Sequence, residues 1–531
     1  MPGGLLNLIA EGNPNRILTG NPTKTLFKAT YAKHTNFGLQ KFRLDYSGQR
    51  SLLLDSSSFF DFKVPRHGDL LMDTYLVVTM PTIWSTIHPP NDEATTWRPY
   101  EFRWIQHLGS QLIKAVRFTV GGQTIQEYSG DYMVQMVERD FDSVKKALYR
   151  KMTGHVEDMY DPEASFGAYP NAYYVDANEG PEPSIRARKL YIPVNCWFSL
   201  ASEMAFPLTC LEYNELHIEF ELRPVKELFT IKRIPQSDGE SNARKSPNFN
   251  EGPEQFYRFI HPPPSYYLTA DDYEDRRTLW NADVHLISTY AFLSEEENNV
   301  FQRGTQTYLI RQVRRHLFPR IVGATKVQID THGLVASWLW HFRRSDCNDR
   351  NEWSNYSNWA YIDQRPHGLE SFVESVTDTD GRPVYITGTY KADNERHIMK
   401  KCGILLDGKA RENTMDAGIY EYIEKYVRTS GNAPNGVYCY HFGTQTNPYD
   451  VQPTGAINTH HFKKIEFELS VMNPPLDPNA VVTTICDDDG NVIGIKKTSW
   501  DMYLYSYEMT IYEERYNMLT LEGGHASMLF S

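Results

Sequence analysis

Cysteine motifs, an excess of positive charge and long apolar runs are all missing from this 531-residue chain. Its six cysteines are scattered without a C-x-x-C pair, which argues against a zinc knuckle or a dense disulfide framework and favours a reducing compartment. Lysine and arginine number 54 against 67 aspartates and glutamates, which argues against coating nucleic-acid phosphates as the main task. The apolar stretch from Leu5 to Ala10 is too short for a membrane span or a secretory signal, so a soluble product is expected.

Recognised catalytic and cofactor motifs are missing too. The chain has no G-x-x-x-x-G-K-[ST] or G-x-G-x-x-G loop, no G-x-S-x-G turn and no H-E-x-x-H pair. Although it has 17 histidines, no H-x-H occurs, and the adjacent His460 and His461 would point to opposite faces of a strand. The aspartates of DTDGR (378–382) and CDDDGN (486–491) lack calcium-loop spacing and are interpreted as hairpin turns. No enzyme activity, metal or cofactor is therefore predicted.

The patterns that are present are those of turn-rich β structure. Aromatic residues make up 13% of the chain, and its 33 glycines and 30 prolines are spread along its length. Val116, Phe118 and Val120 alternate with polar residues and are followed by Gly121-Gly122. Two glycines supply the positive φ angles of a tight turn, so a β-hairpin is predicted here.

The pentapeptide IEFEL occurs twice, at residues 218–222 and 465–469, nearly half the chain apart. In both copies the apolar residues fall at every second position, which predicts a strand with one face in a core. A chain of this length is expected to divide into two domains of roughly 250 residues or into three smaller ones. The repeat therefore favours two similar β domains in tandem.

Helical patterns are few. One helix is predicted behind the caps Ser129 and Asp131, in a loop between strands, and its apolar positions are Met133, Met136, Val137, Phe141, Val144 and Leu148. A second helix is expected to begin at Ser294, where Glu297 completes a capping box. Three segments are expected to form long surface loops: 160–189, 235–255 and 343–396. The last contains Trp353 and Trp359, which are expected to pack on the body of the protein.

Two basic clusters are candidate nucleic-acid-binding surfaces. They are Arg311–Arg320 and the group formed by Lys145, Lys146, Arg150 and Lys151. Neither interleaves aromatic residues as a base-stacking platform does, and the whole chain is acidic. A solvated or partner-facing surface is favoured, and no direct contact with nucleic acid is predicted.

Several motifs, in one order, resemble the major capsid proteins of nucleocytoplasmic large DNA viruses. In the N-terminal half they are GGLLNLIAEG (3–12), LTGNP (18–22), LFK (26–28), HTNF (34–37), VPRHGDLL (64–71), GGQTI (121–125), LYIPVNCWF (190–198) and YNEL (213–216). In the C-terminal half they are YAFLSEEE (290–297), YLIRQV (308–313), GVYCYHF (436–442), QPTGAIN (452–458) and YNMLTLEGGHASMLFS (516–531). The resemblance covers nearly the whole chain, with departures mainly in the loops.

The resemblance implies an all-β fold: two tandem eight-stranded jelly rolls with long inter-strand loops and a few short helices. On this basis we expect an N-terminal arm at 1–24, a first jelly roll at 25–223, a linker at 224–280 and a second jelly roll at 281–531. The segment near 343–396 is expected to be a long surface loop of the second jelly roll.

The resemblance also implies a structural role. The family forms homotrimeric, pseudo-hexagonal capsomers of an icosahedral shell, in the virion and, during assembly, in the host cytoplasm. The implied partners are the chain itself, neighbouring capsomers, minor capsid and penton proteins, and the inner membrane surface. Two alternatives remain open, a minor capsid paralogue and a two-barrel carbohydrate-binding protein whose Trp353 and Trp359 stack on sugars.

The N-terminal segment is the candidate assembly site. Burying the apolar side chains of its first part stabilises it by less than the ordering of about 12 backbone residues costs. This arm is therefore expected to order only against barrel bases, minor capsid proteins or the inner membrane. Its candidate contact residues are Leu5, Leu6, Leu8, Ile9, Phe27, Tyr31 and Phe37.

Overall fold

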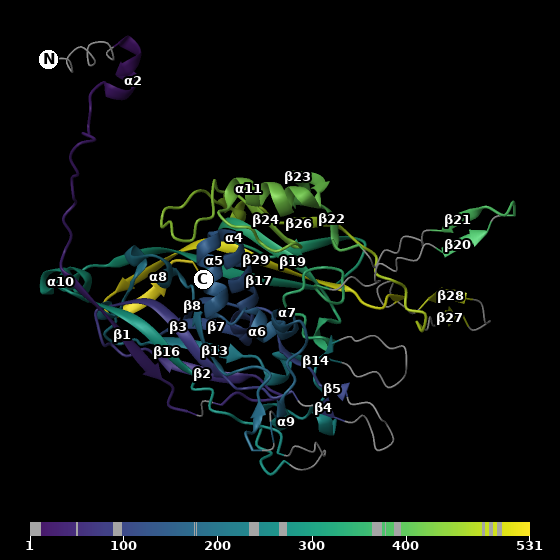
Figure 1. Cartoon of the computed structure of the whole chain (residues 1–531). Helices are drawn as coiled ribbons and strands as arrows, with labels where there is room; N and C mark the ends of the chain where they lie inside the picture. The colour runs from purple at the N-terminus through teal and green to yellow at the C-terminus, as the bar shows by residue number, and fades with distance from the viewer. Residues whose placement is uncertain are drawn as a thin grey trace, which may run out of the picture.

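The computed structural model describes most of the chain as two β barrels side by side (Figure 1). The described residues are 12–48, 51–85, 87–88, 98–174, 176, 178–232, 244–264, 273–363, 374–377, 379–386, 395–480, 484–487, 492–495 and 502–530. Among them, no helix is both long and apolar enough to cross a membrane.

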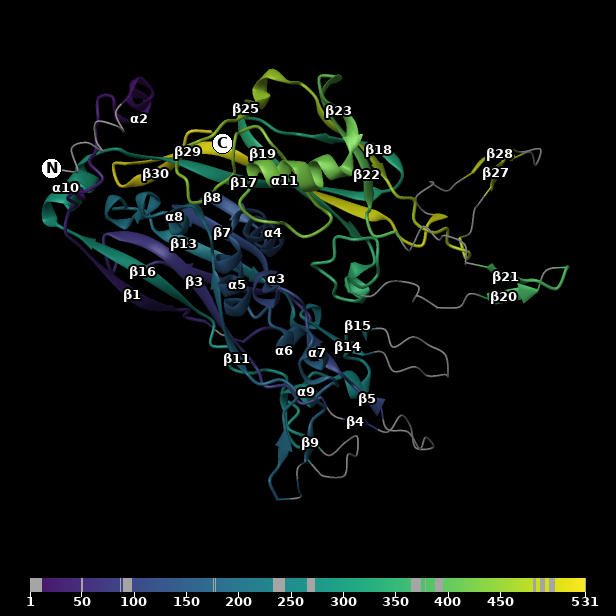
Figure 2. The same ribbon diagram turned by 45° about the horizontal axis from the view of Figure 1, so that its top comes forward.

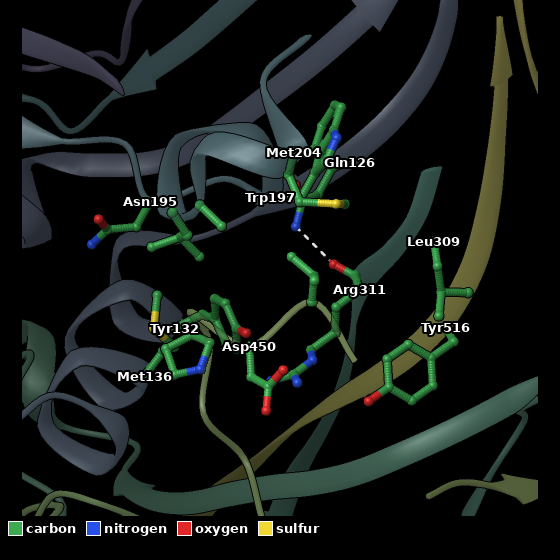
Figure 3. A pocket seen from close by; sticks show the side chains of 14 residues that line it. Gln126, Tyr132, Met136, Asn195, Trp197, Met204, Leu309, Arg311, Asp450 and Tyr516 are labelled. Atoms are coloured by element: carbon green, nitrogen blue, oxygen red, sulfur yellow. Dashed lines mark hydrogen bonds between the residues drawn. The ribbon is translucent and has the colours of Figure 1, made fainter. Parts of the chain in front are cut away.

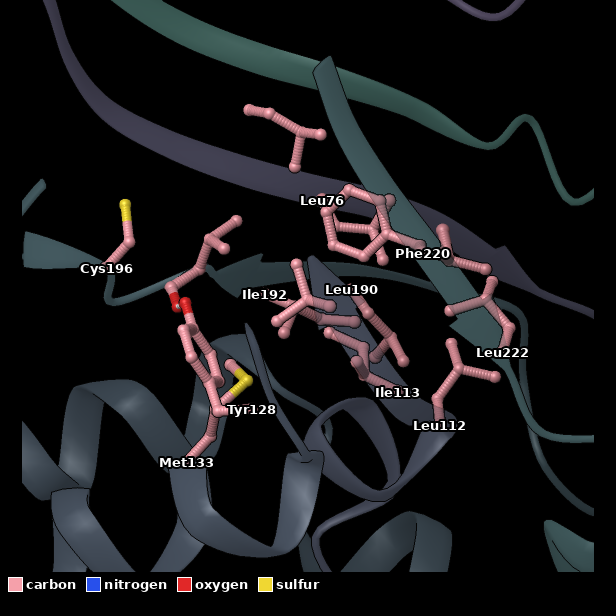
Figure 4. Packing of buried hydrophobic residues seen from close by; sticks show 14 of the residues in the cluster. Leu76, Leu112, Ile113, Tyr128, Met133, Leu190, Ile192, Cys196, Phe220 and Leu222 are labelled. Carbon is pink, nitrogen blue, oxygen red and sulfur yellow. Dashed lines mark hydrogen bonds between the residues drawn. The ribbon is translucent and has the colours of Figure 1, made fainter. Parts of the chain in front are cut away.

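The first barrel consists of two antiparallel sheets, each built on four long strands. One has the order β1 (Phe37–Asp45), β16 (His285–Leu293), β3 (Leu70–Met80), β11 (Arg188–Pro193), and the short strand β12 (Phe206–Pro207) also pairs with β3. The other has the order β2 (Ser58–Lys63), β13 (Leu216–Leu222), β7 (Ile113–Val120), β8 (Gln123–Tyr128). Figure 4 shows side chains of the two sheets meeting between them, with Leu76 and Ile192 from one sheet and Phe220 from the other.

The second barrel repeats this arrangement. Its first sheet has the order β17 (Gln306–Ile321), β29 (Tyr507–Glu522), β19 (Leu334–Arg344), β24 (Val437–His441). Its second sheet has the order β18 (Ala324–Ile329), β26 (Ile465–Val471), β22 (Met399–Leu406), β23 (Lys409–Asp416). In both barrels the first, eighth, third and sixth long strands share one sheet, and the second, seventh, fourth and fifth share the other.

This shared order places the IEFEL repeat in equivalent strands. The first copy lies in β13 and the second in β26, the seventh long strand of each barrel. Both strands alternate buried and half-buried residues along their whole length, with Ile218 and Ile465 at equivalent buried positions. The predicted pair of eight-stranded jelly rolls is confirmed.

The expected domain boundaries differ from the observed pairing. β16 lies between β1 and β3, so it completes the first barrel and does not open the second at residue 281. The expected linker at 224–280 also contributes to the first core, through Val225, Phe229 and Phe259 among others. The first barrel therefore extends to Leu293, and α10 (Glu295–Arg303) leads from it into β17. Strand pairing joins residues that are far apart in the sequence, so local composition revealed neither the boundary at Leu293 nor the contribution of 224–280 to the first core.

The predicted helix after Ser129 is two helices, α4 (Gly130–Asp140) and α5 (Ser143–Met152). The Ser129 side chain caps the first as expected, and Asp142 caps the second by accepting from the amide of Lys145. This second cap breaks the apolar stripe, leaving Val144 and Leu148 exposed. The helix expected at Ser294 is confirmed as α10, with the Ser294 side chain accepting from the amide of Glu297.

Most predicted hairpin turns are present. Gly121 and Gly122 join β7 to β8 with φ angles of 57° and 81°. DTDGR joins β20 (Glu374–Thr377) to β21 (Pro383–Ile386), and CDDDGN joins β27 (Thr484–Cys486) to β28 (Val492–Ile495), although 378 and 488–491 lie outside the described residues.

The remaining elements are short. The helical ones are η1 (Asn13–Asn15), α2 (Arg16–Thr19), α3 (Leu108–Leu112), α6 (Glu157–Tyr160), α7 (Pro162–Phe166), α8 (Trp197–Leu200), η2 (Ser202–Met204), η3 (Leu208–Cys210), η4 (Val225–Glu227), η5 (Gly252–Glu254), α9 (Tyr257–Ile260), η6 (Cys347–Asp349), η8 (Ile419–Ile423), α11 (Glu424–Arg428) and η9 (Thr459–His461). The further strands are β4 (Ile87–His88), β5 (Arg98–Pro99), β6 (Phe102–Trp104), β9 (Tyr173–Tyr174), β10 (Pro181–Glu182), β12 (Phe206–Pro207), β14 (Phe229–Lys232), β15 (Arg244–Lys245), β25 (Ile457–Asn458) and β30 (His525–Met528).

Candidate functional site: the junction between the two barrels

Helix α4 is the central element of the junction. It follows β8 of the first barrel and lies against the sheet that contains β19 and β29 of the second (Figure 1). All its residues from Gly130 to Asp140 are buried, charged ones included. In β19, Trp338 and Trp340 point into the second core, whereas His341 and Arg343, at the alternate positions, face α4. The outer face of this sheet is therefore an internal interface.

The first buried ion pair of the junction joins Asp131 of α4 to Arg343 of β19. One guanidinium nitrogen of Arg343 donates to both carboxylate oxygens of Asp131 at 2.9 Å. Burial alone would raise the pKa of the Asp131 carboxyl, but the positive charge of Arg343 overrides that effect and holds this pKa well below its usual range. Both groups are thus charged inside the protein.

The second ion-pair group lies at the other end of α4. Arg139 donates to Asp140 at 2.7 Å and to Glu514 of β29 at 2.8 Å, and all three side chains are essentially inaccessible. Burial alone would raise the pKa of Glu514, yet Arg139 and Arg311 hold it well below its usual range. For Asp140 burial dominates, and its pKa is raised despite Arg139.

Neutral hydrogen bonds complete the network. The Tyr132 hydroxyl donates to Glu514 at 2.7 Å, and the Gln135 amide lies 2.8 Å from Nδ1 of His341. Burial lowers the pKa of His341 to about 3, so its ring is neutral at pH 7. The Thr446 hydroxyl donates to Asp140 at 2.7 Å. Because buried charges require partners in a fixed geometry, this network sets one relative orientation of the two barrels.

The junction offers little room for a substrate. Figure 3 shows its cavity between α4, β17 and β29, where the amide of Gln126 donates to the carbonyl oxygen of Arg311 at 3.1 Å. The cavity volume is about 70 Å³, well below the roughly 300 Å³ at which small-molecule sites begin. Across the described ranges, no three His, Cys, Asp or Glu side chains are grouped to hold a metal ion. The arrangement is suited to holding two barrels together.

The candidate arm residues lie apart from this junction. Leu5, Leu6, Leu8 and Ile9 fall outside the described residues. Phe27 is 99% exposed and Tyr31 is 89% exposed, on a segment that extends away from the barrels in Figure 1, and Phe37 at the start of β1 is also exposed. Phe27 and Tyr31 are not packed on the barrels, so their contacts within an assembly remain a prediction.

The aromatic residues of the 343–396 segment are packed as expected, which removes the basis of the sugar-stacking interpretation. Trp353 is buried, with its indole NH donating to the Glu227 carbonyl oxygen at 2.9 Å. Trp359 is half-buried with the Arg396 guanidinium 5.0 Å from its ring. Asn355 begins the sequence Asn355-Tyr356-Ser357, which matches an N-glycosylation acceptor motif, and its side chain is also buried.

Sequence reasoning missed most of the junction. It noted Asp131 only as a cap and Arg311 and Arg343 only within larger segments. The available indication was weak: His341 and Arg343 alternate with Trp340 and Phe342 in one strand, which shows only that they point away from a core. Their partners on α4 are hundreds of residues distant, so no local pattern connects them.

Comparison with known proteins agrees with this architecture. The family model described as "Major capsid protein N-terminus" matches residues 25–248. The major capsid protein of Paramecium bursaria Chlorella virus 1 is 22% identical over 537 residues, covering 100% of both chains. That of Phaeocystis pouchetii virus is 29% identical over 301 residues, covering 56% of this chain and 54% of the relative. Residues 25–248 are thus similar to the N-terminal part of major capsid proteins, and the whole chain is similar to the major capsid protein of a large DNA virus.

Solved structures show the same fold. The Faustovirus major capsid protein aligns with a TM-score of 0.63 at 12% identity, and the PBCV-1 virus capsid with 0.60 at 16%. Each alignment covers 96% of this chain and 100% of the other. Apart from the full-length match to the Chlorella virus protein, the chain spans about half the length of the curated relatives it matches first, 54%, 42% and 44% for the viruses of Phaeocystis pouchetii, Chrysochromulina ericina and Acanthamoeba polyphaga.

Proposed function

We propose that this chain is the major structural subunit of an icosahedral capsid and that it acts as a homotrimer. The observation that supports this role is the junction: two barrels of identical strand order are held side by side by buried ion pairs, such as Arg139 with Glu514. Each chain is then a rigid block of two equivalent barrels. Three such blocks give six barrels in a ring, which has the outline of a hexagonal tile.

Light scattering of the purified full chain tests the trimer. The expected mass is three times the 61.5 kDa of one chain. Permanent oligomers bury roughly 2,000 Å² or more per interface, so the trimer should persist at micromolar concentration. A stable monomer under those conditions would overturn the proposal.

The arm is proposed to hold the capsomer to its surroundings in the virion. The support is the exposure of its described aromatic residues Phe27 and Tyr31, which no part of the described chain covers. Proposed contacts are the bases of the barrels, minor capsid and penton proteins, and the inner membrane surface. Deletion of residues 1–12 should leave the trimer intact and prevent shell assembly, and unchanged assembly would contradict this role.

A minor capsid paralogue would have the same fold but a different copy number. The major subunit dominates the protein mass of purified particles, and quantitative mass spectrometry measures that share directly. Parity with proteins of the five-fold vertices would assign the chain to the minor class.

A further inference from the structure

The helical segment formed by η8 and α11 carries apolar residues on the side that faces solvent, whereas a surface helix usually turns its apolar side toward the core. Tyr422, Ile423, Tyr426 and Val427 are all more than half exposed, and Tyr426 reaches 91%. Residues four apart share a helix face, so these side chains form one apolar strip. In Figures 1 and 2 the segment lies at the outer surface of the second barrel.

The opposite side of this segment is anchored by charged groups. The Glu421 carboxylate accepts from the amide of Gly436 at 2.8 Å, and the Lys425 ammonium donates to the Ala433 carbonyl oxygen at 3.5 Å. Both charged side chains are buried. Rolling the helix to bury its apolar strip would break these contacts and leave buried partners unsatisfied, so the strip is held facing outward.

The internal repeat gives this strip a counterpart. In the first barrel, the connection between the fifth and sixth long strands, β8 and β11, carries α4. In the second barrel, the same connection, between β23 and β24, carries η8 and α11. Helix α4 is buried because it lies on the outer face of the next barrel's first sheet. Within the described residues, no further barrel lies against the equivalent segment of the second barrel.

The surface that α4 covers has an uncovered equivalent. On the second barrel, the covered face includes a row across four strands, Arg315, Tyr512, Leu339 and Cys439. Tyr512 and Leu339 are fully buried, and the Tyr512 hydroxyl lies 2.9 Å from that of Ser129, the cap of α4.

The same face of the first barrel presents a similar row, which the described part of the chain leaves partly open. It consists of Arg43, Ile287, Tyr75 and Pro193 on the equivalent four strands. Ile287 and Tyr75 are half-buried, and Tyr191 beside them is 40% exposed. A groove of about 250 Å³ runs between Tyr75 and the exposed Leu148 of α5.

We propose that the strip of Tyr422, Ile423, Tyr426 and Val427 packs on this outer face of the first barrel of a second copy of the chain. The contact reproduces between chains what α4 does within one chain, and repetition of the contact closes a ring after three copies. The inference rests on the proposed trimer and adds the surfaces through which it forms.

Charge insertion tests the strip. Tyr426→Glu places a charge in a buried aromatic contact, so the trimer dissociation constant measured by sedimentation should rise at least about thirtyfold. The matched control is Val300→Glu on α10, an apolar side chain of comparable exposure on a helix remote from the strip. Circular dichroism checks that both variants keep the native fold. An unchanged dissociation constant for Tyr426→Glu overturns the inference.

Cross-linking tests the pairing of the two surfaces. The exposed Cys486 is first replaced by serine, since the other five cysteines are buried. Chains carrying Tyr426→Cys and mass-tagged chains carrying Tyr191→Cys are mixed, reassembled and treated with a short bis-maleimide. A mixed dimer is expected, and its yield should drop when Val300→Cys replaces Tyr426→Cys. A wild-type trimer without the mixed dimer refutes the inference alone, whereas a monomeric wild type refutes the proposed function.

Discussion

Arg139 of helix α4 donates a 2.8 Å hydrogen bond to Glu514 of strand β29, and both side chains are inaccessible to solvent. The two residues come from different barrels and are separated by most of the chain. Because of this contact, the buried charge of Arg139 in the first half of the chain is neutralised by a residue of the second barrel. Folding of the two halves is therefore expected to be coupled.

Removing one charge of this pair should strongly destabilise the protein. Glu514→Gln leaves Arg139 with a weakened partner in a buried site, and the expected loss of unfolding free energy is about 3 to 5 kcal/mol, measured by urea denaturation. The control is Arg186→Ala. Arg186 and its partner Glu182 are both mostly exposed, so this change should lower the unfolding free energy by less than about 1 kcal/mol. Equal effects of the two changes would contradict the assignment.

Gly431 allows a close backbone approach between helix α4 and the second barrel. Its amide donates to the Arg139 carbonyl oxygen at 2.8 Å, and a Cβ added there would lie 2.6 Å from that oxygen. Gly431→Ala should push α4 away from this segment of the second barrel. The unfolding free energy, measured by thermal or urea denaturation, should fall by about 1 to 3 kcal/mol. Gly252→Ala, where a Cβ meets no atom within 4 Å, is the matched control and should be nearly neutral.

Acid sensitivity should come in part from His441. Burial, with help from Arg139, lowers its folded-state pKa to about 3, while the unfolded value is about 6.5. Between these values only the unfolded state binds the proton, so stability falls as pH decreases, by about 1.4 kcal/mol per pH unit for this residue. His441→Asn should reduce the slope of unfolding free energy between pH 6 and 4 by that amount. The control His460→Asn changes an exposed side chain and should leave the unfolding free energy at pH 7 nearly unchanged.

The exposed arm aromatics should matter for assembly and not for folding. Phe27→Ser combined with Tyr31→Ser removes no intrachain packing, so unfolding free energy should change by less than about 0.5 kcal/mol. Particle assembly, followed by electron microscopy, should decrease because the lost apolar surface is available only to partners. A large loss of stability would show that the arm packs on its own barrel.

The alternation of apolar and polar residues, together with the turn and capping residues, was sufficient to predict much of the local structure. The Gly121-Gly122 hairpin, the capped helix at Ser294 and the two IEFEL strands follow from residue preferences within a few positions. The break at Asp142 was not predicted, because the apolar spacing continues through it, whereas in the structure Phe141 has an extended backbone and Asp142 caps the next helix.

The sequence by itself determined the strand faces, the turns and the tandem repeat, because these depend on side-chain periodicity and on backbone preferences that act over short distances. Only the tertiary structure decided that β16 completes the first barrel and that Asp131 and Arg139 meet Arg343 and Glu514. The physical reason is that ion pairs and strand pairs form between residues that are close in space, and these residues can be far apart in the sequence. Two halves of similar pattern acquire different surroundings only when one is folded against the other.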